Sequence, residues 1–147
     1  MTPYPDRVLM VMAGALGALM AEVRTPFGAQ TAGLSAALAG LLAQEWDRAA
    51  ARLVEENTAV TGLLERARLI VTDEALHVRI DTVIARIPAS DLRVSALRTE
   101  NDELRGVLVD VHAAVDGVAG EQHELLNRLI WDELRESTRR RHLVTGR

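Results

Sequence analysis

The chain has 147 residues, of which 48% are hydrophobic but only 3% aromatic, and it contains neither cysteine nor lysine. The missing cysteine excludes disulfides, thiolate zinc sites, iron–sulfur ligation and cysteine nucleophiles. The missing lysine excludes Schiff-base chemistry and a standard phosphate-binding loop. A net charge of −4 argues against general nucleic-acid binding, which needs a basic surface.

The core has to be built from Ala, Leu and Val, because aromatic residues are so few. Ala and Leu favour helices, and little in the composition favours a sheet. We therefore predict an all-α fold, an up-down helical bundle of four main helices plus one shorter helix. The length fits a single helical-bundle domain over residues 1–147, in which residues 143–147 fray.

The first helix is expected over residues 6–24. It contains fourteen consecutive uncharged residues, 8–21, where a membrane span needs about 20. A signal-peptide core is the alternative, but no small-residue cleavage site follows the run. We therefore expect a helix that is buried on most faces, followed by a turn at Pro26 in which Phe27 plugs the end of the bundle.

The second helix is predicted to begin between residues 29 and 35 and to reach Val71. Its apolar residues recur in steps of four and three, which is typical of near-parallel helix packing. A break near residues 55–57 or at Gly62 is the alternative to one long helix, and continuity is favoured. The stripe consists of Leu42, Trp46, Ala49, Leu53, Val60, Leu63, Ala67 and Ile70.

Three further helices complete the expected bundle. Thr72 or Asp73 caps one that reaches residue 87 before Pro88, and Ser90 or Asp91 caps the next. The last helix is expected over residues 121–142. The fourth helix carries the stripe Leu97, Asn101, Leu104, Leu108, Val111, Val115 and Val118, and the fifth presents Leu125, Leu126, Leu129, Ile130 and Leu134.

A Leu-x-x-Glu-Asn segment occurs twice, starting at Leu53 and at Leu97, and each copy is followed by a glycine, Gly62 or Gly106. Internal duplication and coincidence both explain the match. The glycines suggest that the two helices pack closely. The polar residues either form a structural layer between these helices or converge on a ligand pocket, and the structural layer is favoured. They are Glu56, Asn57, Glu100 and Asn101.

Glu74 and His77 are the nearest approach to a metal-binding motif. Their Glu-x-x-His spacing places both side chains on one helical face, but di-iron bundles use two such motifs plus two further glutamates. Solvated helix faces explain the pair more simply. We predict no catalytic residue, no cofactor and no identifiable cofactor-binding residue, since the serines lie in cap or helix contexts.

Four arginines end the last helix: Arg135, Arg139, Arg140 and Arg141. Cations there complement the negative end of the helix dipole. The alternative is contact with an anion or an acidic partner, and the acidic residues 73–134 supply a target within the molecule or in a second copy. Trp131, on the same helix, is predicted to fill the core, with an interface anchor as its alternative.

These observations favour a non-enzymatic helical interaction or structural protein that is soluble, cytoplasmic and self-associating as a homodimer, or bound to another cytoplasmic protein. No nucleic-acid or membrane partner is expected. The alternative is a bundle that binds a small ligand or metal in a polar pocket near Glu56 and Asn101, accessory to an enzyme. Convergence of the four polar residues around a cavity favours the alternative, whereas a molecular mass above that of the monomer favours association.

Overall fold

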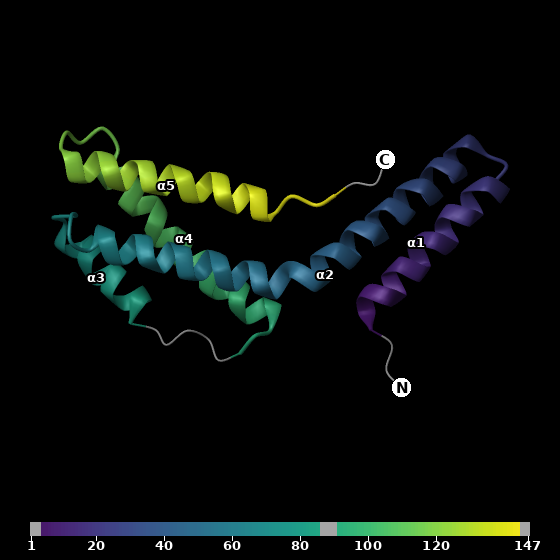
Figure 1. The fold of residues 1–147 in the computed structure, drawn as a ribbon, viewed down its shortest axis with the longest axis horizontal. Helices are drawn as coiled ribbons and strands as arrows, with labels where there is room; N and C mark the ends of the chain where they lie inside the picture. The colour runs from purple at the N-terminus through teal and green to yellow at the C-terminus, as the bar shows by residue number, and fades with distance from the viewer. Residues whose placement is uncertain (1–3, 86–90, 145–147) are drawn as a thin grey trace. The chain divides into compact units, whose positions relative to one another are not determined.

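The protein is described by a computed structural model over residues 4–85 and 91–144, and this part of the chain forms five α-helices (Figure 1). No strand occurs within these two ranges, which confirms the prediction of an all-α helical bundle. The up-down order of the helices stays a prediction. The helices are α1 (Pro5–Glu22), α2 (Pro26–Ala67), α3 (Glu74–Ile84), α4 (Val94–Val115) and α5 (Glu121–Arg140).

The helix ends follow local chemistry. Pro26 begins α2, three residues earlier than expected, because a first-turn proline lacks only an N–H that would have no partner in the helix. Asp73 caps α3 by accepting a hydrogen bond from the backbone N–H of Leu76 at 3.0 Å. Of the two caps predicted for α4, Asp91 was wrong, because the helix begins after Arg93 and has no side-chain cap. The alternative, Ser90, and the predicted end of α3 at residue 87 lie outside the described residues. α2 runs unbroken for 42 residues, so its predicted continuity is confirmed.

Backbone contacts divide the chain into two compact units that share α2. Unit 1 comprises residues 1–49 and 142–147, and therefore α1 with the N-terminal half of α2. Unit 2 comprises residues 50–141, and therefore the rest of α2 with α3, α4 and α5. That both units fold together as one domain stays a prediction.

Unit 2 contains the hydrophobic core. Its fourteen buried members come from α2, α3, α4 and α5 and from Val71, which follows α2. The stripe predicted along α4 is buried from Leu97 to Val115, whereas Val118 lies beyond the helix and is exposed. The core members include Val60, Leu64, Ile80, Leu104, Val111, Leu126 and Ile130.

No described residue of unit 1 belongs to this core. α1 has no buried residue, which contradicts the expected burial on most of its faces. Phe27, Leu42 and Trp46 were also expected in the core and are exposed instead. The periodic pattern identified an apolar face correctly, but that face is exposed. α1 lies beside this part of α2 (Figure 1), and the segment after α5 hydrogen-bonds to Gln44 and Arg48.

The two glycines that follow the repeated segment, Gly62 and Gly106, do not serve close packing. A Cβ atom added to Gly62 or Gly106 would meet no other atom within 4 Å, so no neighbouring helix approaches them. The expectation that they let two helices pack closely was therefore wrong. Each glycine is a residue of low helix propensity inside a helix, and no neighbouring atom requires the absence of a side chain there.

Candidate functional site

Glu56, midway along α2, is the most enclosed charged side chain of unit 2, with no exposed surface. Arg141 contacts both carboxylate oxygens, with Nη2 2.7 Å from Oε2 and Nε 3.1 Å from Oε1. Ser137 donates to Oε1 at 3.2 Å, and Arg105 donates to Oε2 at 3.3 Å. Arg52, one turn earlier on α2, lies 3.5 Å from Oε1. We call these five residues the Glu56 cluster.

The Glu56 cluster keeps its carboxylate ionised. Burial raises the pKa of Glu56, because a buried charge loses its hydration. The hydrogen bond and the charge of Arg141 act in the opposite direction and favour the charged form. Together with the charge of Arg105 and the hydrogen bond from Ser137, they lower the pKa of Glu56 from 4.5 to about 2.

An amide pair continues the cluster between α2 and α4. Asn101 donates from Nδ2 to Oδ1 of Asn57 at 2.8 Å, and both side chains are buried. Asn57 in turn donates to the backbone carbonyl of Leu97 at 3.2 Å. Arg105 joins the two groups, because its Nε donates to Oδ1 of Asn101 at 3.1 Å. One polar layer therefore links α2, α4 and α5.

Of the four polar residues singled out in the sequence, the structure brings together Glu56, Asn57 and Asn101. Glu100 lies outside the layer and lines a groove of about 430 Å³ beside Asn57 and Leu97. Sequence reasoning missed Arg52, Arg105 and Ser137. The two arginines stand four residues from Glu56 and from Asn101, a spacing that places them on the same helical face. Ser137 carries no such signal.

The chemistry of the polar layer suits a structural contact between helices. Each carboxylate oxygen of Glu56 accepts from Arg141 and from at least one other donor, so its lone pairs are occupied. A metal ion there would face the guanidinium groups of Arg52, Arg105 and Arg141 and be repelled by them. A buried network satisfied in this way fixes which turns of the helices meet.

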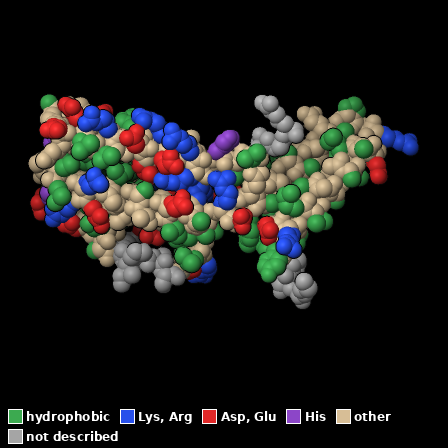
Figure 2. Space-filling view, in the orientation of Figure 1, with side chains coloured by type: hydrophobic (Ala, Val, Ile, Leu, Met, Phe, Trp, Pro, Cys, Tyr) green, Lys and Arg blue, Asp and Glu red, His purple; other side chains and the backbone are tan. Residues whose placement is uncertain are grey.

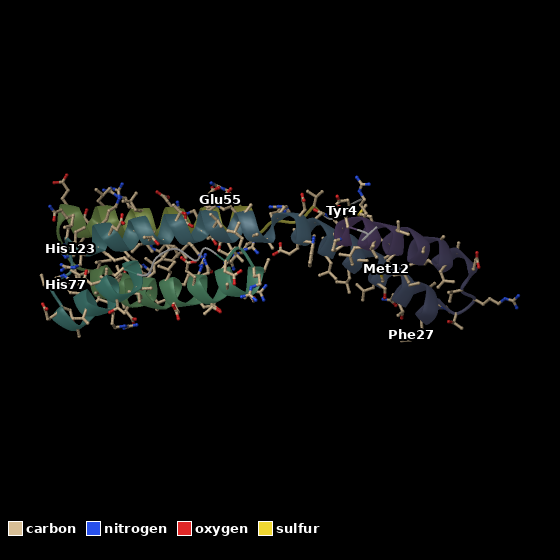
Figure 3. All side chains as sticks on the ribbon, turned by 90° about the horizontal axis from the view of Figure 1, so that it is seen from below. Tyr4, Met12, Phe27, Glu55, His77 and His123 are labelled. Atoms are coloured by element: carbon tan, nitrogen blue, oxygen red, sulfur yellow. The ribbon has the colours of Figure 1, made fainter. Side chains whose placement is uncertain are left out.

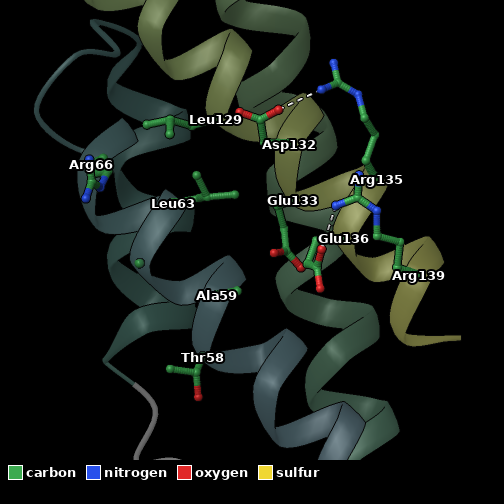
Figure 4. A pocket seen from close by; sticks show the side chains of 11 residues that line it. Thr58, Ala59, Leu63, Arg66, Leu129, Asp132, Glu133, Arg135, Glu136 and Arg139 are labelled. Carbon is green, nitrogen blue, oxygen red and sulfur yellow. Dashed lines mark hydrogen bonds and ion pairs between the residues drawn. The ribbon is translucent and has the colours of Figure 1, made fainter.

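The predicted anion-contact arginines all have acidic neighbours. Arg135 bonds Asp132 at 2.7 Å and Arg139 bonds Glu136 at 3.0 Å, beside a groove of about 510 Å³ between α2 and α5 (Figure 4). These are exposed pairs within α5. The groove wall therefore carries both signs of charge, which gives a free anion no net attraction.

Arg140 and Arg141 contact acidic residues in the middle of α2. Arg140 bonds Glu133 at 2.8 Å and lies 3.6 Å from Glu55. Arg141 belongs to the Glu56 cluster. Both contacts agree with the expectation that acidic residues inside the molecule are targets of these arginines, although those on α2 precede the acidic segment 73–134.

Glu74 and His77 lie on one face of α3, with Nδ1 of His77 3.9 Å from Oε2 of Glu74. Across residues 4–85 and 91–144, no three His, Cys, Asp or Glu side chains lie close enough together to hold a metal ion. A metal at this pair stays an untested prediction.

Trp131 is half exposed, so its predicted place in the core was wrong. Its ring meets the edge of His112 at a centroid distance of 5.4 Å and an interplanar angle of 87°. His112 pairs through Nε2 with Oδ1 of Asn127 at 3.1 Å, and Asn127 donates to Asp116 at 3.3 Å. These contacts join α4 to α5 at the surface of unit 2.

The comparisons found no family model that matches the chain, and no curated protein or solved structure that matches it significantly. Among the described residues, no helix is both long and apolar enough to span a membrane. The function is therefore argued from the chain alone.

Proposed function

We propose that the chain is a non-enzymatic helical interaction protein, in which unit 1 makes the contact and unit 2 is the folded support. The observation that carries this proposal is the distribution of apolar side chains. Thirteen of the 21 large apolar side chains that are exposed belong to unit 1, although unit 2 contributes more of the described residues. Figure 2 shows apolar side chains gathered over this part of the chain, with few charges among them on the visible face.

The buried residues of unit 1 also support the proposal. Its buried apolar residues, among those described, are all alanines: Ala32, Ala39, Ala43 and Ala49. Each buried alanine contributes little, since the free energy of burial scales with apolar area. An α-helix with an apolar stripe is stable when another element covers the stripe. Large side chains of unit 1, including Tyr4, Met12 and Phe27 in Figure 3, are 49% to 80% exposed, so the described part of the unit covers them only partly.

The alternative function, a ligand or metal bound near Glu56 and Asn101, has weaker support. The cluster residues bond one another, and the groove nearest to them is bordered by Asn57 and Glu100 rather than by the carboxylate of Glu56. The layer therefore supports a role in holding unit 2 together.

Site-specific photo-crosslinking tests the proposal. A benzoylphenylalanine replaces exposed Leu38 in unit 1 or, as the matched control, exposed Leu69 in unit 2. After irradiation of the producing cells, mass spectrometry identifies the crosslinked chain. We expect protein adducts at position 38 and none at position 69. Failure to form a protein adduct at position 38 would overturn the proposal.

A further inference from the structure

Nine of the thirteen large apolar side chains that are exposed in unit 1 lie along one stripe on α1 and one stripe on α2. Their exposed fractions range from 39% to 80%. We define them as the apolar face of unit 1: Val8, Val11, Met12, Leu19, Phe27, Leu34, Leu38, Leu42 and Trp46.

Helical geometry places both stripes on the same side of unit 1. With about 100° of rotation per residue, the α1 stripe lies roughly 110° from the partly buried positions Leu9, Ala13 and Leu16. The α2 stripe is offset from buried Ala32 and Ala39 by about the same angle and in the same sense. α1 and α2 run antiparallel (Figure 1), so equal offsets of equal sense point to one side of the pair.

The size of this face matches a stable protein contact. Full burial of an aromatic side chain covers roughly 150–250 Å², so Phe27 and Trp46, which are 80% and 61% exposed, together leave on the order of 300 Å² open. The seven smaller aliphatic side chains add to this area and bring the face toward about 800 Å², the area per partner of a standard interface.

The charges of unit 1 favour a protein over a membrane surface. Helices that lie on anionic lipid carry Lys and Arg along the polar face. The described part of unit 1 has three arginines, Arg7, Arg24 and Arg48, against the four acids Asp6, Glu22, Glu45 and Asp47. This balance gives no attraction to an anionic bilayer.

We propose that a second copy of this chain covers the apolar face of unit 1, so that two α1–α2 pairs pack face to face as four helices. The inference rests on the proposed function and names its partner. A two-helix apolar face is complementary to a copy of itself, since leucine and valine ridges of one pair fill the grooves of the other.

Light scattering of the full chain tests the association. We expect twice the monomer mass of 16.1 kDa for the natural sequence and for the control Leu69→Glu. The double variant Leu38→Glu/Leu42→Glu should fall to 16.1 kDa while its helical circular dichroism and the acid unfolding of unit 2 are retained. A natural chain that stays monomeric at millimolar concentration, or a double variant that still dimerises, overturns the inference. So does binding of a monomer to anionic phosphatidylglycerol vesicles.

The two proposals can fail separately. A crosslink from position 38 to a different protein, with a monomeric purified chain, overturns the second copy as partner and leaves the interaction function standing. No protein adduct at position 38 together with a monomeric chain overturns both.

Discussion

Arg141 and Glu56 form a two-point contact between the residue that follows α5 and the middle of α2, with distances of 2.7 and 3.1 Å. They stand 85 positions apart in the chain. A planar guanidinium matches a carboxylate at two atoms, which a lysine ammonium cannot do. The contact therefore fixes the end of α5 against α2.

Arg141→Ala should lower the free energy of unfolding of unit 2 by about 1–2 kcal/mol, because Glu56 stays buried with fewer donors. Arg141→Lys should recover less than half of that loss, since it keeps the charge but not the paired geometry. Urea unfolding followed by circular dichroism measures both. The control is Arg139→Ala, which removes an exposed pair with Glu136 and should cost about 0.5 kcal/mol or less. Equal losses of unfolding free energy at positions 139 and 141 would contradict the role of Arg141 in holding the end of α5 against α2.

Acid should weaken unit 2 through Glu56. The folded-state pKa of Glu56, about 2, lies below the ordinary value of 4.5, so this group stabilises the fold above pH 4.5, and that contribution disappears as pH falls toward 2. The shift corresponds to about 3 kcal/mol in total. The free energy of unfolding, measured between pH 6 and pH 2, should fall across this window.

Glu56→Gln should be less stable at neutral pH and should flatten that part of the pH profile. The comparison variant is Glu136→Gln, which removes an exposed carboxylate and should leave the slope between pH 4.5 and pH 2 nearly unchanged. If the Glu56→Gln profile keeps the full slope, other carboxylates control the acid response.

The amide pair gives a direct measure of coupling between α2 and α4. Asn101→Ala and Asn57→Ala should each destabilise unit 2 by about 1–3 kcal/mol, because each leaves a buried polar partner unsatisfied. The double variant should lose less than the sum of the two, since the broken hydrogen bond is shared. Additive losses would contradict a direct bond. If native mass spectrometry finds the same bound molecules on Asn101→Leu as on the natural chain, the result supports a structural role for Asn101.

Much of unit 2 could be predicted from the sequence, because the interior of a bundle imposes a helical period on its apolar residues. The stripe of α4 and the polar position at Asn101 followed from that period. The bond from Asn57 to Asn101 and the approach of Arg141 to Glu56 could not be predicted. A stripe shows which face of a helix is buried, but not which turn of one helix meets which turn of the next.

The exposed residues of unit 1 have a related explanation. The apolar stripe through Leu42 and Trp46 has the same period as a buried stripe. The period does not show which element, if any, covers the stripe. The composition did not predict whether this stripe is buried. An Ala-rich segment lets two helices approach closely, but it buries little apolar area when they do. The corrected positions, Phe27, Leu42 and Trp46, are three of the nine residues that define the apolar face of unit 1.

Gly62 and Gly106 allow the effect of helix propensity on stability to be measured without a change in tertiary contacts. A Cβ at either position meets nothing within 4 Å, so alanine adds helix propensity without a clash. Gly106→Ala and Gly62→Ala should each raise the free energy of unfolding by about 0.5–1 kcal/mol. Thermal unfolding should show each variant melting above the natural chain.

The matched control is Gly117→Ala. An added Cβ at Gly117 also meets nothing within 4 Å, but its φ is +74°, a left-handed conformation that alanine adopts with strain. This variant should be destabilised by about 1 kcal/mol or more. Because all three sites are open, the opposite signs would come from backbone conformation alone. Destabilisation by Gly106→Ala would instead show that a neighbour approaches α4 more closely than the 4 Å clearance allows.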